Sequence, residues 1–194
     1  MTRAFRQRVP LPLPVIARGV RSLEPHLPFV VAAKHFPDAK PLDANRSSLL
    51  MQDLVLNRAD PESSLWWQDR LEELSSEGVT TVKGQSFRDE NAVRRHLNEY
   101  LLPMIDGLAR NGWDDKLAES GPGSASIGPH GELLKAESVN HRFFLARSLG
   151  VREFPLLVRS VHHDWWDTNV LKGRRTASRS EAEQAFKVVA ESHR

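Results

Sequence analysis

The sequence contains no cysteine, no long apolar segment and no large excess of charge of either sign. Without cysteine the chain cannot form disulfides, thiolate metal sites or a thiol nucleophile, a composition that fits a reducing compartment. No apolar run approaches the roughly 20 residues that a membrane-spanning helix requires. The apolar stretch 9–17 follows basic residues, but Pro10, Pro12 and Pro14 make it unsuitable as a signal peptide. We therefore expect a soluble cytoplasmic protein with no membrane insertion.

The charge balance is nearly neutral, since 27 Lys and Arg residues against 25 Asp and Glu residues give a net charge of +2. Such a balance does not by itself identify a nucleic-acid-binding protein. Arginines nevertheless gather near both ends of the chain. They are Arg3, Arg6 and Arg8 at the start and Arg174, Arg175 and Arg179 near the end. Solvated tails and contacts with a DNA backbone both explain such clusters, and we retain the last three as candidate nucleic-acid contacts.

The length of 194 residues fits one domain with appendages. The early prolines predict an extended arm over 1–24, followed by a domain over 25–170 and by a basic linker with a C-terminal helix over 171–194. Apolar spacing predicts strands at 29–34, 79–83, 132–136 and 155–161, and helices at 47–57, 61–77, from about 87 to 105, 138–149 and from 180 onward. This alternation predicts an α/β or α+β fold.

Capping residues and glycines set the expected helix ends. The predicted caps are Asp60 before Pro61, Ser86 with Asp89, and Ser180 with Glu183. Gly78 and Gly150 are the predicted helix stops, and Pro103 is expected to kink or break its helix. The segment 119–131, with four glycines, two prolines and three serines, predicts a loop. It is either a mobile lid or a surface connection, and it closes in a tight turn over 128–131.

The most informative segment is the predicted strand–turn–helix unit over 132–149. A helix start leaves backbone N–H groups without partners and concentrates positive charge, so it attracts anions. Asn140, His141 and Arg142 fall in the first turn, directly after Ser138. Asn and His add directional hydrogen bonds, and Arg adds a fork of donors that suits phosphate. These residues are the predicted phosphate site.

Two structural alternatives remain open at this site. Arg142 could pair with Glu137 or Glu132, and His141 could be a satisfied, partly buried side chain. Glu137 either positions a water molecule or Mg²⁺ beside a phosphate, or stabilises the helix dipole as an N-terminal carboxylate.

The residues Val139-Asn140-His141-Arg142, the helix FFLARSLG and the strand from Val151 to Val158 resemble the ParB/sulfiredoxin-like superfamily. Members carry a Gly-Glu/Asn-Arg/His-Arg box, an apolar helix, a glycine and a strand rich in Val and Pro. The resemblance covers roughly Ile127 to Val161 and includes the turn Pro129–Gly131. A weaker second match, Pro41 to Arg46, is similar to the Asn-Pro-x-Arg segment of the family, whose arginine approaches the nucleotide.

The resemblance implies a single-domain ParB/sulfiredoxin-like fold with a small mixed sheet flanked by helices. Among compact members the chain looks most like the plasmid fertility-inhibition (Osa-like) branch. That branch implies an ATPase and DNase that uses ATP and Mg²⁺ and inhibits conjugative transfer. The resemblance adds Arg46 to the predicted phosphate-binding residues, which are otherwise Ser138, Asn140, His141 and Arg142. The predicted catalytic residues are Glu137, His141 and Arg142.

Several features of the sequence differ from the family pattern and exclude some of the functions found in the family. Val139 replaces the glycine of the box, and the absent cysteine excludes sulfinic acid reduction. Too few residues follow Val161 for the helix-turn-helix domain of centromere-type members. Two alternatives remain: a non-catalytic inhibitor or adaptor that binds a protein of the conjugation machinery, and a kinase of free serine.

A second polar cluster ends the last predicted strand. Alternate residues of a strand share a face, so His162 and Asp164 could hold a metal ion, with Glu137 as a further ligand. The alternative is a polar strand end beside aromatic cover. The pairs Trp66-Trp67 and Trp165-Trp166 either stack on bases or pack in the core.

Overall fold

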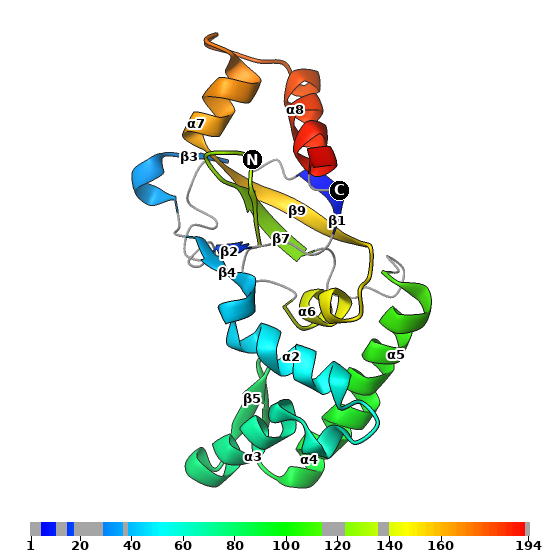
Figure 1. The fold of residues 1–194 in the computed structure, drawn as a ribbon. Helices are drawn as coiled ribbons and strands as arrows, with labels where there is room; N and C mark the ends of the chain where they lie inside the picture. Colours follow the sequence, from blue (N-terminus) through cyan, green and yellow to red (C-terminus); the bar gives the residue numbers. More distant parts are fainter. Residues whose placement is uncertain are drawn as a thin grey trace.

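The computed structural model describes residues 5–10, 15–17, 29–36, 39–113, 123–135 and 140–192. Over these residues the chain is a mixed α/β protein, with a seven-stranded mixed sheet flanked by helices (Figure 1). The strand order is β1 (Phe5–Pro10), β9 (Glu153–His162), β7 (Gly123–Ile127), β8 (Leu133–Lys135), β2 (Val15–Ala17) and β4 (Ala39–Pro41), and β3 (Val30–Val31) also pairs with β9. Strand β9 is the centre of this sheet, because it runs parallel to β7 and β3 and antiparallel to β1.

Strand β7 corrects the prediction of a loop over 119–131, of which 119–122 lie outside the described residues. All five residues of β7 are buried. Its small side chains serve close packing rather than flexibility: a Cβ atom on Gly123 would lie 2.9 Å from Cδ2 of Leu156. The Oγ atoms of Ser126 and Ser160 are 2.7 Å apart inside the sheet. The predicted tight turn is confirmed, since the Gly128 N–H donates to the Glu132 carbonyl at 2.9 Å.

Helix α6 (Asn140–Ser148) follows β8 and lies between the sheet and α2 (Arg46–Leu56) (Figure 1). Five consecutive residues of α6 are buried, because the helix is covered on both sides. Phe143 packs edge-on against Phe154 of β9, with ring centroids 5.4 Å apart. The predicted helix stop is confirmed at Gly150, which has a φ of +68°.

Beyond α2 the chain forms a helical unit with a small hairpin. It contains α3 (Leu65–Glu77), β5 (Thr80–Val82), β6 (Gln85–Phe87), α4 (Glu90–His96) and α5 (Leu102–Asn111). The predicted helix over 47–57, the strand at 79–83 and the stop at Gly78 are confirmed, since Gly78 has a φ of +69°. The strand predicted at 29–34 is shorter than expected, because a 3-10 turn begins at Ala33.

Two predicted helix starts are wrong by a few residues. Pro61 opens only a 3-10 turn, and the Ser64 hydroxyl caps α3 by accepting from the Trp67 N–H at 3.3 Å. Ser86 lies in β6, whereas Asp89 caps α4 by accepting from the Ala92 N–H at 2.8 Å. In both places the capping residue lies closer to the apolar run than the sequence pattern indicated.

Pro103 does not break its helix. A π-helical turn, η4 (Leu97–Leu101), joins α4 to α5, and Pro103 lies in the first turn of α5. The wider turn accommodates the missing N–H group of proline without ending the helix.

The chain ends in α7 (His163–Trp166), the π-helical turn η5 (Asp167–Leu171) and α8 (Arg179–Ser192), at the opposite end of the sheet from α3 and α4 (Figure 1). Within the predicted N-terminal arm, residues 5–10 and 15–17 are extended, and both segments are strands of the sheet. None of the described helices combines the length and apolar composition that crossing a bilayer requires.

The cap of α8 provides a first test of the fold. Ser178, rather than the predicted Ser180, forms the capping box: its Oγ accepts from the Glu181 N–H at 3.2 Å, and its N–H donates to Glu181 at 2.7 Å. We expect Ser178→Ala to lower the free energy of unfolding by about 1 kcal/mol, because it removes the cap. Ser180→Ala is the matched control and should change it by less than half as much. Urea denaturation of both variants measures the difference, and equal effects would contradict the assignment.

Candidate functional site

The predicted phosphate site lies where β8 leads into α6. Asn140, His141 and Arg142 form the first described turn of α6. Glu137 and Ser138, the other predicted residues of this site, lie outside the described residues. The strand and the helix of the predicted unit are therefore present, as β8 (Leu133–Lys135) and α6, and three of the predicted side chains are placed.

Arg142 is buried with no hydrogen-bond acceptor among the described residues. Its exposed fraction is 8%, and its Nη1 atom is shut off from solvent with no hydrogen-bond partner. It forms no ion pair with any described residue, and the carboxylate of Glu132, one of its expected partners, accepts from the His130 N–H at 2.8 Å. A buried guanidinium without an acceptor is strongly unfavourable. An anion bound beside Arg142 would remove this penalty.

A second cation, Lys135, lies at the end of β8 and was missed by the sequence analysis. Its side chain is fully buried, its Nζ donates to Oδ1 of Asn140 at 3.2 Å, and it lies 5.2 Å from the ring centroid of Phe143. This contact fixes the Asn140 amide with its oxygen toward Lys135, so the NH₂ group points elsewhere as a donor. The signal in the sequence was a lysine that ends an apolar strand directly before the helix.

His141 is largely buried and electrically neutral at pH 7. Burial, and after it the electrostatic influence of Lys83, His96 and Arg70, lowers the pKa of His141 to about 4. Its Nδ1 atom is buried with no hydrogen-bond partner. His141 therefore contributes no positive charge to phosphate binding, and its electrostatic neighbours belong to α3, α4 and the β5–β6 hairpin.

His96 is a second imidazole in this group. It is half-buried, and burial followed by the charge of Lys83 lowers its pKa. Its ring stacks on Tyr100 with centroids 4.9 Å apart, and Lys83 donates a hydrogen bond to the Tyr100 hydroxyl. Two neutral imidazoles and several cations thus lie together between α6 and the helical unit.

Arg46 forms an ion pair with Asp69 and not with a described residue of the predicted phosphate site. It begins α2 and pairs with the buried carboxylate of Asp69, whose hydrogen bond raises the pKa of Arg46. The preceding turn contacts the last turn of α6, because Arg147 donates to Asp43 at 2.6 Å. The structure therefore connects this segment to the opposite end of α6 from Arg142, and no described contact joins Arg46 to the predicted phosphate site.

His162 and Asp164, the predicted metal ligands, form a helix cap. The buried His162 accepts the Asp164 N–H through Nδ1 at 3.2 Å, which places its proton on Nε2. Metal binding through Nε2 would therefore require the loss of this cap. Across the part of the chain that the structure describes, no group of three or more His, Asp or Glu side chains is arranged to hold a metal ion.

The arginines near the end of the chain are largely paired. Arg174 donates to Glu181 at 2.6 Å, Arg179 donates to Glu183 at 2.6 Å, and Arg175 is exposed. Contact with DNA through these residues remains a prediction.

The tryptophan pairs pack mainly in the core, as one of the two sequence readings expected. Trp66, Trp67 and Trp165 are each less than 5% exposed, and only Trp166 is partly accessible. Three of the four rings are therefore unavailable for stacking on bases.

Comparison with known proteins adds no family assignment. The chain matches no protein-family model, no curated protein and no solved structure.

Proposed function

We propose that the chain binds the phosphates of a nucleotide, with ATP as the first candidate, at the start of α6 and hydrolyses it, with DNA as a second substrate. The observation that carries this proposal is Arg142, a buried guanidinium with no acceptor among the described residues. The sequence resemblance supplies the reaction type. Inhibition of plasmid conjugation through a protein of the transfer machinery is the role that the same resemblance implies.

Each described side chain has a distinct part in this proposal. Arg142 would hold two phosphate oxygens, and it would stabilise the charge that develops on them as the phosphate bond breaks. Asn140 would donate its NH₂ group to a third oxygen while Lys135 holds the amide in place. The free N–H groups of the helix start would complete the cradle.

Mg²⁺ is the ion that phosphate transfer usually recruits, where it neutralises charge on the phosphate oxygens. The described side chains beside Arg142 are cations and amides rather than carboxylates, so they suit the phosphate and not the metal. Glu137, outside the described residues, remains the expected ligand of Mg²⁺.

A second candidate function is phosphate binding without turnover. His141 favours it, because this predicted catalytic group is largely buried, neutral and surrounded by cations rather than exposed beside Arg142. A binding-only protein would retain every contact of Arg142 and Asn140 and lose only the release of phosphate.

Calorimetric titration of ATP, with and without Mg²⁺, tests the binding proposal. We expect saturable binding to the unmodified protein and at least a roughly tenfold loss of affinity in Asn140→Asp, because the new carboxylate pairs with Lys135 and repels phosphate. Asn91→Asp makes the same charge change on the exposed surface of α4 and should bind normally. An absence of ATP binding, or equal binding by both variants, would refute the proposed site.

Turnover assays then separate the candidate activities. Release of phosphate from ATP, together with nicking of a supercoiled plasmid, supports the hydrolase. Formation of phosphoserine from serine and ATP would identify the kinase instead. Binding with no product of either kind supports the binding-only protein.

A further inference from the structure

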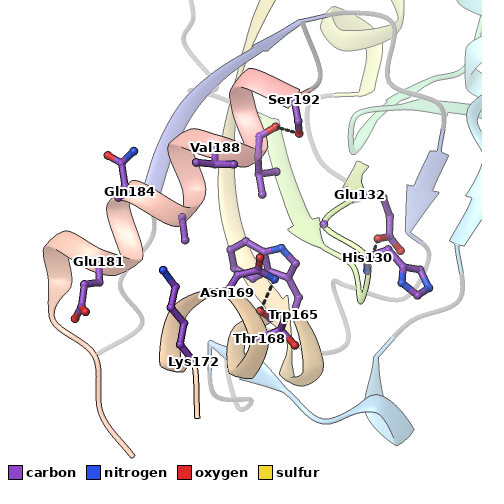
Figure 2. Close-up of a pocket in the computed structure, with 13 residues that line it drawn as sticks. His130, Glu132, Trp165, Thr168, Asn169, Lys172, Glu181, Gln184, Val188 and Ser192 are labelled. Carbon is purple, nitrogen blue, oxygen red and sulfur yellow. Dashed lines mark hydrogen bonds between the residues drawn. The ribbon is translucent and has the colours of Figure 1, made fainter. Parts of the chain in front are cut away.

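A separate cleft lies between α8, the helix formed by α7 and η5, and the turn that joins β7 to β8 (Figure 2). Its volume is about 650 Å³, within the range of pockets that hold small molecules. It follows α8 from Glu181 to Ser192, a length of roughly 16 Å at 1.5 Å per residue. The cleft therefore has the size and the elongated shape of a small-molecule site.

One wall and the floor of the cleft are apolar. Val188 and Ala185 line it from α8, and Val188 is 54% exposed although it is a large apolar side chain. Trp165 lies between α8 and the 130–132 turn (Figure 2), and it is held rigid by stacking on Phe186 with centroids 5.6 Å apart. This surface suits the apolar part of a ligand.

The backbone approaches the Trp165 indole closely from the turn. Gly131 has a φ of +87°, and a Cβ atom there would lie 3.1 Å from Nε1 of Trp165. The indole N–H has no acceptor among the described residues, so it is a donor that a ligand can use. Glycine at position 131 therefore keeps this edge of the indole free of a side chain.

The charged side chains that line the cleft differ in their hydrogen bonds and ion pairs. Glu181 accepts from the Ser178 N–H at 2.7 Å and from Arg174 at 2.6 Å, and these contacts lower its pKa to about 2. Glu132 accepts from the His130 N–H at 2.8 Å. Lys172, by contrast, has no ion pair within the described part of the chain. Among the described residues that line the cleft, Lys172 is thus the charged side chain without a partner, whereas Glu181 pairs with Arg174 and Glu132 is bound to the backbone of its own turn.

Lys172 also has an unfavourable backbone conformation. Its φ is +52°, in the left-handed region that glycine occupies easily and lysine does not, and Gly173 follows it. Figure 2 shows its side chain reaching from the end of η5 toward α8. This left-handed conformation caps the C-terminal end of η5, where the Lys172 N–H donates to the Asp167 carbonyl at 2.8 Å, and it sets the direction in which the side chain leaves the helix.

We propose that this cleft binds a small carboxylate with an elongated apolar body. The carboxylate pairs with the Lys172 ammonium, and the apolar body lies along Val188 and Ala185 of α8, with only the small exposed edge of Trp165 within reach. Thr168 and Gln184 line the same cleft and supply further hydrogen-bonding groups. This site is independent of the proposed phosphate site, because it lies at the turn that precedes β8 and the phosphate site lies after β8.

Titration with octanoate, followed by the NMR signal of the Trp165 indole N–H, tests this site. Trp165→Phe assigns the signal. We expect a saturable shift with octanoate and at least tenfold weaker binding of octanamide, which has the same tail without the charge. Lys172→Gly should weaken octanoate binding at least tenfold while it raises the thermal midpoint, because glycine relieves the strained backbone.

Lys83→Gly is the matched control, since Lys83 also has a φ of +52° and lies far from the cleft in the β5–β6 turn. It should bind octanoate normally, as should Asn140→Asp, whose defect belongs to the phosphate site. No saturable shift in the unmodified protein, equal binding of octanamide, or normal octanoate binding by Lys172→Gly would each overturn the proposal.

Discussion

Replacement of Arg142 by methionine is expected to weaken ATP binding strongly and to stabilise the ligand-free protein. Methionine fills most of the same space without a charge, so the variant no longer buries an unpaired guanidinium. We expect the free energy of unfolding to rise by about 1–3 kcal/mol, the usual penalty of a buried unsatisfied polar group. ATP affinity should fall by about 2 kcal/mol or more, roughly 30-fold, because a buried charged contact is lost.

Arg147→Met is the matched control on the same helix. Arg147 pairs with Asp43 at 2.6 Å, so its loss should lower the free energy of unfolding slightly, by about 0.5 kcal/mol, and leave ATP binding intact. The two substitutions are thus expected to shift stability in opposite directions. Urea denaturation and calorimetry measure both effects. A destabilised Arg142→Met protein that still binds ATP would show that Arg142 has a purely structural role.

The elements that sequence reasoning placed correctly are those with a strong local pattern. The helix α2, the strand β5 and the stops at Gly78 and Gly150 follow from apolar spacing and from the conformational freedom of glycine. Strand β7 was misread because Gly and Ser are typical of loops, whereas here they fill a tightly packed central position. Tertiary packing, which no local pattern records, decides such segments.

The candidate site, like the fold, was predicted only in part from the sequence. The residue types at 140–142 predicted an anion site, and the structure places these residues in the first described turn of α6, where Arg142 is buried with no acceptor among the described residues. The sequence did not reveal Lys135, because a single lysine after two leucines is typical of an exposed strand end. Nor did it reveal that Arg46 pairs with Asp69, a contact between residues 23 positions apart. Long-range pairing of charges depends on the fold.

Acidification from pH 6.5 to pH 4 is expected to lower the stability of the protein by about 3 kcal/mol through His141 alone. The pKa of His141 falls from 6.5 to about 4 on folding, chiefly because the side chain is buried. Above pH 6.5 both states are neutral and the stability is fully present. Between the two values only the unfolded state takes up the proton, so stability falls as the pH falls. The difference between these two pKa values corresponds to the loss of about 3 kcal/mol in the free energy of unfolding.

Denaturation by urea at pH 7, 6 and 5 measures the slope of the free energy of unfolding against pH. This pH range lies above the range in which carboxylates usually titrate. His96 adds to the slope in the same direction, because its pKa is also lowered. His141→Leu should therefore flatten the slope without abolishing it. An unaltered slope in His141→Leu would contradict the burial of a neutral imidazole.

The slope of the free energy of unfolding against pH also tests whether His141 belongs to the phosphate site. Bound ATP brings negative charge, which favours the protonated imidazole if the phosphates lie within a few ångströms of it. In that case saturating ATP raises the pKa of His141 and makes the protein less sensitive to acid. If the slope is the same with and without ATP, His141 lies outside the site, its assignment to catalysis is wrong, and Arg142 and Asn140 alone hold the phosphate.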